Sequence, residues 1–219
     1  MAKLTKSAQD LHHNVPPDWY ESSVKINLLQ KFWHWRRFIA IDRFSEKVSG
    51  DILDIGSADG YFTAEIARTT GCSNIYGIDV LPSSVAYAKN RYRSDPRFHF
   101  SLGDGHKLKF PATRFSAVYC LEAMEHVFNP AQVLKEIKRV LKPGGYTVIL
   151  VPSENWLFSR IVWPMWLRWR GRIWADTHLS FFSGNKLPDL LTKAGFVNVE
   201  THRFLLGMLL LVKARKIRP

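Results

Sequence analysis

From residue 51 onward, short runs of apolar and β-branched residues alternate with stretches of helical periodicity. Apolar residues recur every three or four positions over 131–141, which predicts an amphipathic helix stopped by Pro143-Gly144-Gly145. Shorter helices are expected at 84–88 and 187–194, and a longer one over 24–41. Repeated strand–helix units build an α/β fold around a mostly parallel sheet. The expected strands are 51–55, 74–80, 97–102, 115–121, 145–151, 196–202 and 207–214.

The last two expected strands are close together and have no helical segment between them. They should therefore pair as an antiparallel hairpin, whereas the earlier strands need crossover connections. The pattern as a whole predicts seven strands with helices on both faces of the sheet.

The chain is strongly basic. Its 219 residues include 31 Lys and Arg against 19 Asp and Glu, which leaves a net charge of +12 with His neutral. Such a charge attracts nucleic acid, phospholipid headgroups and acidic metabolites alike. With 46% apolar and 23% charged residues, the composition is that of one globular domain and excludes a disordered or collagen-like chain.

The ends of the sequence and its cysteines predict a cytoplasmic protein. Residues 1–30 contain no sustained apolar run of the kind that marks a signal peptide. The most apolar segment, 204–212, is about half the ~20 residues that a membrane-spanning helix needs, and is expected to be a buried strand. Cys72 and Cys120 lack metal-type spacing and are expected to be reduced thiols.

A glycine turn follows the first strand. The segment 51–63 runs from a strand through Gly56 and Gly60 into a helix. Glycines suit such a turn because a ligand must approach the backbone closely and because a Cβ penalises the dihedrals required. The spacing differs from the dinucleotide fingerprint, and the lysine of a phosphate-cradling loop is missing, so a phosphate ligand is not favoured.

Two further acids lie just beyond the ends of the next strands, where open α/β sheets bind ligands. Asp79 ends the second strand, at about the ~20-residue offset at which an acid accepts hydrogen bonds from a ribose diol. Asp104 follows the third strand and can accept from an adenine amine. Taken alone, each of these aspartates is equally well explained as a residue that stabilises a turn after a strand. Asp54, Asp79 and Asp104 in order after three strands argue against coincidence.

These segments resemble a class I S-adenosylmethionine-dependent methyltransferase over about residues 51–214. The resemblance is carried by 54–60, Asp79, 103–105, 115–127, 141–146 and 178–195. It implies a Rossmann-like, seven-stranded, mostly parallel sheet that binds S-adenosylmethionine. It further implies that loop 54–60 contacts the methionine part, Asp79 the ribose, and Asp104 with Gly105 the adenine.

The full set of expected cofactor-binding residues is Asp54, Gly56, Ser57, Ala58, Gly60, Asp79, Val80, Asp104, Gly105 and Leu121. Ala58 stands where the family usually has a glycine. The methyl group narrows the loop slightly, and we infer no loss of binding from it.

After the fourth strand, Glu122-Ala-Met-Glu125-His126 offers two carboxylates and an imidazole. On a helix, Glu122, Glu125 and His126 would share one face and could hold Mg²⁺ or another divalent ion as a Lewis acid for a substrate oxygen. The pattern is similar to metal-using quinone-ring O-methyltransferases and RNA terminal 2′-O-methyltransferases. His178 is a candidate fourth ligand.

The alternative for this segment involves no metal. Many methyltransferases of this class carry a Glu-His pair here, in which the Glu caps the loop and the His lines the pocket. His126 is then a general base or a substrate contact, and His178 a hydrogen-bond donor that anchors a lid. The expected catalytic residues are His126, Glu125 and His178, whereas Glu122, Glu125 and His126 are the expected metal ligands.

The insert at 155–174 is aromatic and basic. It holds five of the eight Trp, four Arg and no acid. Trp suits the headgroup boundary of a membrane and Arg suits anionic lipid. The insert can equally cover the substrate pocket with its Trp packed inward, and the two roles are compatible. RNA is a third candidate ligand, opposed by the scattered basic residues and by the lack of an RNA-binding module.

We therefore expect one domain over 1–219, made of a helical cover at 1–45, a cofactor-binding core at 46–154, a hydrophobic basic lid at 155–182, and a C-terminal helix and hairpin at 183–219. The expected activity is methyl transfer to a small apolar or lipid-like acceptor of the quinol or prenyl-lipid type, on oxygen rather than carbon or nitrogen. The rivals are methylation of RNA or protein, and a catalytically silent, membrane-associated cofactor-binding protein. A cytoplasmic protein of this kind would contact the inner face of the membrane.

Overall fold

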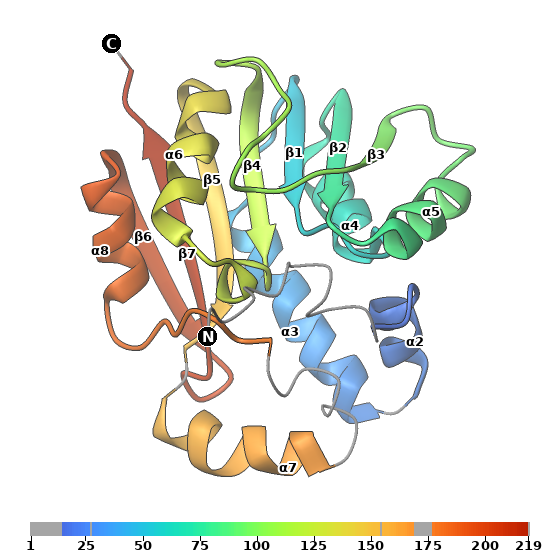
Figure 1. Ribbon diagram of the computed structural model, residues 1–219, viewed down its shortest axis with the longest axis vertical. Coiled ribbons are helices and arrows are strands. Elements are labelled where there is room, and N and C mark those ends of the chain that lie inside the picture. Colours follow the sequence, from blue (N-terminus) through green and yellow to red (C-terminus); the bar gives the residue numbers. More distant parts are fainter. Residues whose placement is uncertain (1–14, 27, 154, 169–176, 219) are drawn as a thin grey trace, which may run out of the picture.

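A seven-stranded sheet forms the centre of the computed structural model, which describes residues 15–26, 28–153, 155–168 and 177–218 (Figure 1). The strand order is β3-β2-β1-β4-β5-β7-β6. Strands β1 to β5 pair in parallel, whereas β7 pairs antiparallel with both β5 and β6. The predicted Rossmann-like sheet and its C-terminal hairpin are confirmed. The strands are β1 (Asp51–Ile55), β2 (Asn74–Asp79), β3 (Phe98–Leu102), β4 (Phe115–Leu121), β5 (Leu141–Pro152), β6 (Phe196–Phe204) and β7 (Leu209–Lys216).

Helices lie on both faces of the sheet (Figure 1). On one face, α6 and α8 bury Leu134, Ile137 and Leu187 against the strands. On the other, α3 and α4 bury Ile41 and Ile66. The helices are α2 (Trp19–Ile26), α3 (Leu28–Phe44), α4 (Tyr61–Thr70), α5 (Pro82–Arg91), α6 (Pro130–Val140), α7 (Trp163–Arg168) and α8 (Lys186–Lys193), with a 3₁₀ turn η1 (Met124–His126) and a π-helical turn η2 (Phe158–Val162). None of the described helices combines the length and apolarity that crossing a bilayer requires.

The junction of α6 and β5 differs from the prediction. Helix α6 ends at Val140, and Leu141 already pairs with Phe115 as the first residue of β5. The Pro-Gly-Gly sequence lies inside the strand, where Gly144 has a φ of 76° and the pairing with β4 shifts register. The helix therefore ends just before Pro-Gly-Gly, as predicted, whereas β5 begins at Leu141 and not at 145, because a positive φ at glycine lets a strand bulge without ending it.

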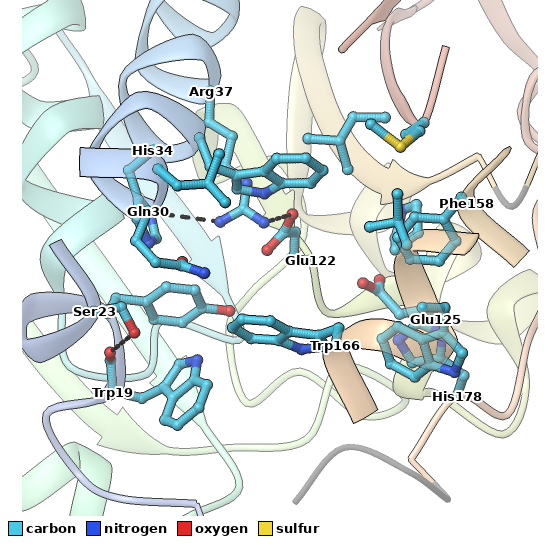
Figure 2. Close-up of a pocket in the computed structure, with 18 of the residues that line it drawn as sticks. Trp19, Ser23, Gln30, His34, Arg37, Glu122, Glu125, Phe158, Trp166 and His178 are labelled. Carbon is cyan, nitrogen blue, oxygen red and sulfur yellow. Dashed lines mark hydrogen bonds and ion pairs between the residues drawn. The ribbon is translucent and has the colours of Figure 1, made fainter. Parts of the chain in front are cut away.

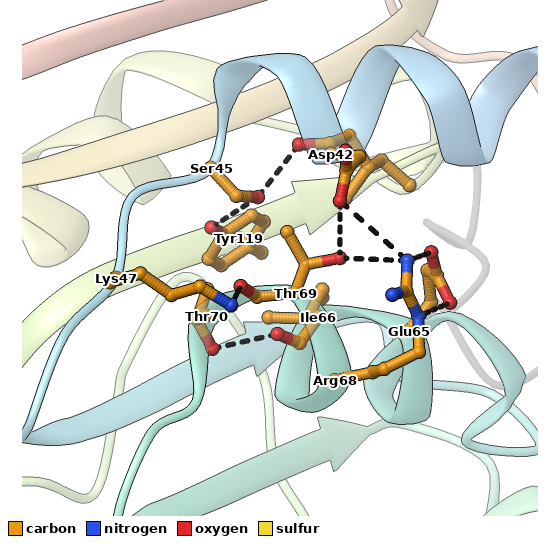
Figure 3. Close-up of polar contacts among 10 residues, drawn as sticks. Asp42, Ser45, Lys47, Glu65, Ile66, Arg68, Thr69, Thr70 and Tyr119 are labelled. Carbon is orange, nitrogen blue, oxygen red and sulfur yellow. Dashed lines mark hydrogen bonds and ion pairs between the residues drawn. The ribbon is translucent and has the colours of Figure 1, made fainter.

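Polar contacts fix the C-terminal end of α3 to the sheet and to α4 (Figure 3). The Tyr119 hydroxyl of β4 donates to Ser45 Oγ at 2.8 Å, and Ser45 Oγ donates to the Ile41 carbonyl at 2.7 Å. Lys47 Nζ donates to the carbonyl of Thr69, at the end of α4, at 2.6 Å. Helix α3 is therefore held in one position at this end, which determines where its other end lies beside the site.

Asp54 joins the end of β1 to α4. Its buried carboxylate accepts a hydrogen bond from Thr63 Oγ1 at 2.6 Å. Burial raises the pKa of Asp54 to about 7, nearby Asp79 adds to the rise, and the Thr63 hydrogen bond acts against it. Burial also raises the pKa of Asp59, in the same loop, to about 6.

These two acids give stability a definite pH dependence. Their pKa in an unfolded chain is about 3.9, so the folded protein keeps protons that the unfolded chain loses between about pH 4 and pH 7, and stability falls as pH rises through that range. Asp54→Asn removes one titrating group and should flatten the fall. Thr63→Val removes the hydrogen bond that favours the charged carboxylate and should steepen it. Melting temperatures at about pH 5 and about pH 8 test both, and an unchanged slope in Asp54→Asn would contradict the assignment.

Candidate active site

The loop between β1 and α4 forms a cradle for a ligand. Gly56 and Gly60 have φ values of 78° and 77°. A Cβ on Gly56 would lie 2.4 Å from the Ala123 Cβ, and one on Gly60 would lie 2.8 Å from Phe100, so both positions require glycine. The buried Ser57 Oγ has no hydrogen-bond partner among the described residues. A tight loop with an unused buried hydroxyl fits a bound polar ligand.

Ala58, the departure from the family pattern, also adopts a positive φ, of 44°. A left-handed alanine costs roughly 1–2 kcal/mol, which other contacts must offset. The Ala58 N–H donates to Asp79 Oδ2 at 2.9 Å, and the Leu81 N–H donates to Asp79 Oδ1 at the same distance. Asp79 therefore holds the loop in shape from the neighbouring strand.

The other expected cofactor residues follow the same edge of the sheet. Asp104 is exposed, and its Oδ1 accepts from the His106 backbone N–H at 2.9 Å. Gly105 is buried against Ile55, Val80 is half-buried after β2, and Leu121 is buried at the end of β4. The strands thus bring the expected residues to their carboxyl ends, as the resemblance implies.

Asp59 was missed by the sequence reasoning. It is fully buried, and its carboxylate accepts from the Tyr61 N–H at 3.0 Å and from the Glu21 N–H of α2 at 2.8 Å. The first contact is a local one that an acid at a helix start commonly makes. The second fixes α2 over the loop, and no spacing in the sequence indicates it.

A cavity of about 470 Å³ lies between the N-terminal helices and the insert (Figure 2). No residue of loop 54–60 lines it, but its wall includes Glu122, next to the Ala123 that Gly56 faces. Its walls are mostly aromatic or aliphatic, and a few polar side chains enter it from α3 and from the segment after β4. The lining includes Trp19, Tyr20, Trp33, His34, Arg37, Glu122, Glu125, His126, Phe158, Trp163, Met165, Trp166, His178 and Met208. Apolar pockets with a few polar groups are typical binding sites for small molecules.

The insert forms one wall of this cavity. Phe158, Trp163 and Trp166 line it, whereas Trp156 is 71% exposed. The predicted lid at 155–182 is described only at 155–168 and 177–182, so the Trp and Arg of 169–174 lie outside the described residues, as do positions 1–14 of the helical cover.

Glu122 does not join Glu125 and His126, contrary to the predicted metal set. The segment is not a helix at this point, because Glu122 has a φ of 54° and only 124–126 form a single 3₁₀ turn. Its carboxylate instead meets the guanidinium of Arg37, with Oε1 and Nη2 2.6 Å apart, and both side chains are nearly buried (Figure 2). Burial raises the pKa of Glu122, against the opposing effects of Arg37 and His178.

Arg37 and His34 were also missed. Arg37 Nη1 lies 3.5 Å from His34 Nδ1, and burial together with the Arg37 charge lowers the pKa of His34 to about 3, so this imidazole is neutral. The buried Arg37 Nε has no hydrogen-bond partner among the described residues. The only signal in the sequence was that an imidazole and a cation stand three positions apart in a segment rich in aromatic residues. The sequence does not show that both lie on the buried face of α3.

The structure groups Glu125, His126 and His178 instead. One potential ligand atom from each lies within 4.8 Å of the others. The N–H groups of Leu179 and Ser180 donate to the Glu125 carbonyl at 2.8 and 2.9 Å, which brings the 177–180 segment onto η1. His178 thus stands where Glu122 was expected.

The tautomer of His126 follows from its partner. His126 Nδ1 lies 2.9 Å from the Thr177 carbonyl, which can only accept, so Nδ1 carries the proton and Nε2 the lone pair. Nε2 lies 4.0 Å from Glu125 Oε1, and both residues line the cavity. An imidazole held in this way can take a proton from a ligand.

The donor set also bears on the expected metal. Two imidazoles and one carboxylate suit ions such as Zn²⁺, Fe²⁺ or Mn²⁺, whereas Mg²⁺ prefers oxygen ligands throughout. Glu125, His126 and His178 therefore fit a divalent ion of the first kind better than the expected Mg²⁺.

The chain matches known proteins over most of its length. Residues 32–201 match the family model described as a methyltransferase domain. The ubiquinone/menaquinone biosynthesis C-methyltransferase UbiE of Desulfotalea psychrophila is 28% identical over 86% of this chain and 82% of its own. The demethylmenaquinone methyltransferase of Tropheryma whipplei is 25% identical over 97% and 92%.

A solved structure has the same fold. The putative methyltransferase of Haloferax volcanii, solved with its Trm112 activator, superposes with a TM-score of 0.75 at 19% identity, over 93% of this chain and 98% of that one. With the family model covering the glycine loop, Asp79 and the cavity residues after β4, the chain belongs to the methyltransferase-domain family and is a class I S-adenosylmethionine-dependent methyltransferase.

Proposed function

We propose that the protein transfers the methyl group of S-adenosylmethionine to a small, apolar, lipid-like acceptor of the quinol or prenyl-lipid type. The observation that carries this proposal is the aromatic cavity, with His126 and Glu125 as polar groups in its wall. An aromatic ring fills such a cavity, and a ring hydroxyl gives the polar groups a partner. The names of the two curated relatives, both quinone-pathway methyltransferases, support a quinol.

The residues of the loop would hold the cofactor. S-Adenosylmethionine supplies an electrophilic methyl group on a sulfonium. Loop 54–60 would take the methionine part, Asp79 with Val80 the ribose, and Asp104 with Gly105 the adenine, while Leu121 lies beneath. Asp79 also accepts hydrogen bonds from the backbone N–H groups of Ala58 and Leu81. The residue that would bind the ribose therefore also fixes the shape of the loop.

His126 would serve as the general base. Its Nε2 takes the proton of the acceptor hydroxyl, while the Nδ1–H remains bonded to the Thr177 carbonyl. Glu125, 4.0 Å away, stabilises the imidazolium that results. His178 packs edge-to-face on His126 at 5.2 Å between ring centroids and keeps the ring in place. With the acceptor oxygen aligned behind the methyl carbon, the methyl group would be transferred by in-line displacement, and S-adenosylhomocysteine would be the leaving group.

Oxygen is the methylated atom in this proposal, and ring carbon is the second candidate. Deprotonation of a quinol hydroxyl raises electron density on the oxygen and also on the adjacent ring carbon, so the same base serves both outcomes. The word C-methyltransferase in the name of the Desulfotalea psychrophila relative favours carbon. Mass spectra of the product separate a methoxy group from a ring methyl group.

RNA and protein acceptors fit the site less well. The described walls of the cavity are mostly apolar, whereas a nucleic-acid channel needs a basic groove that follows the phosphates. The net charge of +12 is instead compatible with a cytoplasmic protein that works at an anionic membrane.

The ribose role of Asp79 can be tested by calorimetry. Asp79→Asn removes the charge and cannot accept both backbone hydrogen bonds, so we expect the affinity for S-adenosylmethionine to fall about 10- to 100-fold. The matched control is Asp95→Asn, a half-buried acid whose side chain contacts Arg97. Affinity equal to the wild type in Asp79→Asn would reject the assignment.

The base can be tested without disturbing its anchor. His126→Asn places an amide N–H where Nδ1–H stood and removes Nε2, so we expect kcat with short-chain quinols to fall about 10²- to 10⁴-fold while the affinity for cofactor stays unchanged. His99→Asn, at an exposed imidazole of β3, is the control. A fall of less than about threefold would show that His126 is not the base.

As an alternative to the base role of His126, we propose that Glu125, His126 and His178 can hold one divalent ion, which would act as a Lewis acid for the acceptor oxygen, with His126 as a ligand and not as the base. After dialysis against a chelator, titration with Mn²⁺ should show one saturable site per chain. His178→Ala should weaken it about tenfold or more, whereas His99→Ala, at an exposed imidazole of β3, should leave it intact. Equal weakening by both variants, or no saturable binding, would exclude this ligand set.

A further inference from the structure

The cavity opens between the beginning of α3 and α7. Leu29 of α3 and Met165 of α7 both line it, yet they are 67% and 64% exposed. Large apolar side chains that are at once wall and surface mark the mouth of the cavity. An acceptor that enters here meets apolar side chains before it reaches the polar groups inside.

The outer face of α3 continues this apolar surface. Leu28, Phe32, Trp35 and Ile39 recur at four- and three-residue spacing, so they form one stripe along the helix, and all are exposed. The opposite face of α3 is buried in the protein. The outer stripe is therefore an apolar surface that remains exposed, and a surface of this kind marks an interaction site.

The insert and the β6–β7 turn add a second apolar group. Trp156 is exposed, and so is Leu206 at 81%. Asn155 Nδ2 donates to the Leu206 carbonyl at 2.9 Å, which holds the insert against the turn. Figure 1 shows the beginning of α3, α7 and this turn at the same end of the molecule, beyond the carboxyl ends of the central strands.

Exposed cations lie on the helices at and next to this end. They are Lys25 on α2, Lys31 on α3, Arg160 on η2 and Arg168 on α7. The acid of α2, Glu21, is bonded to Lys25, Arg91 and Tyr87. Apolar side chains surrounded by Lys and Arg suit the interface of an anionic bilayer, where the hydrocarbon boundary takes the former and lipid headgroups the latter.

We propose that this end of the molecule, formed by the first half of α3, α7 and the β6–β7 turn, docks onto the surface of an anionic lipid bilayer and opens the mouth of the cavity toward the acyl chains. The inference rests on the proposed function in that a lipid-like acceptor would enter directly from the bilayer. A second copy of the chain is a poorer occupant, because two such ends would bring their cations face to face.

Vesicle flotation tests the docking. We expect the wild type to float with vesicles of phosphatidylcholine and phosphatidylglycerol, and much less with phosphatidylcholine alone. Two double variants remove separate parts of the surface: Leu28→Ser with Phe32→Ser, and Trp156→Ser with Leu206→Asn. Each should lower the partition coefficient about tenfold or more, because each removes two apolar side chains that docking would bury in the bilayer.

The matched control removes an apolar side chain elsewhere. Ile217 is 58% exposed and follows β7, whose C-terminal end lies at the opposite end of the molecule from α7 (Figure 1). Ile217→Ser should therefore not change flotation. Melting temperatures confirm that the variants fold. The proposal would be overturned if the wild type did not float. It would also be overturned if high salt abolished flotation while neither double variant changed it. A concentration-dependent dimer, without vesicles, that both double variants dissociate would overturn it as well.

Activity on a soluble acceptor separates this inference from the proposed function. Methyl transfer to a short-chain quinol in the absence of vesicles should be the same in the wild type and in both double variants, because none of the four residues lines the cavity. Methyl transfer without flotation would reject the docking alone. Flotation without methyl transfer to any quinol would reject the proposed acceptor alone.

Discussion

The buried ion pair between Arg37 and Glu122 is the contact on which the arrangement of the site depends. It joins α3, from the N-terminal part of the chain, to the backbone that leaves β4. Loss of one partner of such a pair leaves a buried charge uncompensated, which costs about 3–5 kcal/mol. Burial keeps the His34 imidazole beside Arg37 neutral, and the charge of Arg37 adds to this effect by lowering the His34 pKa further. The N-terminal helices are therefore part of the cavity wall.

The other contacts of the N-terminal helices place the two sides of the site relative to each other. Asp59 holds α2 over the glycine loop, and Ser45 holds the far end of α3 to Tyr119 of β4. The cofactor loop and the acceptor cavity thus share their supporting contacts. The hydrogen bond from the Glu21 N–H to Asp59 joins the glycine loop directly to α2. Because α2 forms part of the cavity wall, a change in the shape of the loop would shift that wall.

The sequence predicted the sheet well and the site only in part. The strands, the hairpin and the place of the expected cofactor residues at one edge follow from local patterns, since each acid comes at or directly after the end of a strand and parallel strands end at one edge. The metal set failed because it assumed a helix through 122–126, and a single positive φ at Glu122 turns that carboxylate toward Arg37. Arg37 and the hydrogen bond from Glu21 to Asp59 could not be foreseen, because contacts between distant segments depend on how the helices pack. The helix ends where the Pro-Gly-Gly segment predicted, but the next strand begins four residues earlier than expected, at Leu141, because glycine permits a bulge within a strand.

The attachment of the insert has a consequence for how the acceptor can change. Three of the contacts of 177–180 with η1 use backbone groups, namely the carbonyl of Thr177 and the N–H groups of Leu179 and Ser180, and these three do not depend on side-chain identity at those positions. The Ser180 hydroxyl adds one more, to the Val127 carbonyl. The aromatic residues that the insert adds to the cavity wall lie before them, in η2 and α7. Substitutions there would reshape the cavity while the attachment still holds the His126 ring. Under the proposed function, acceptor choice and proton transfer are therefore separable traits, and related chains can diverge in the first without losing the second.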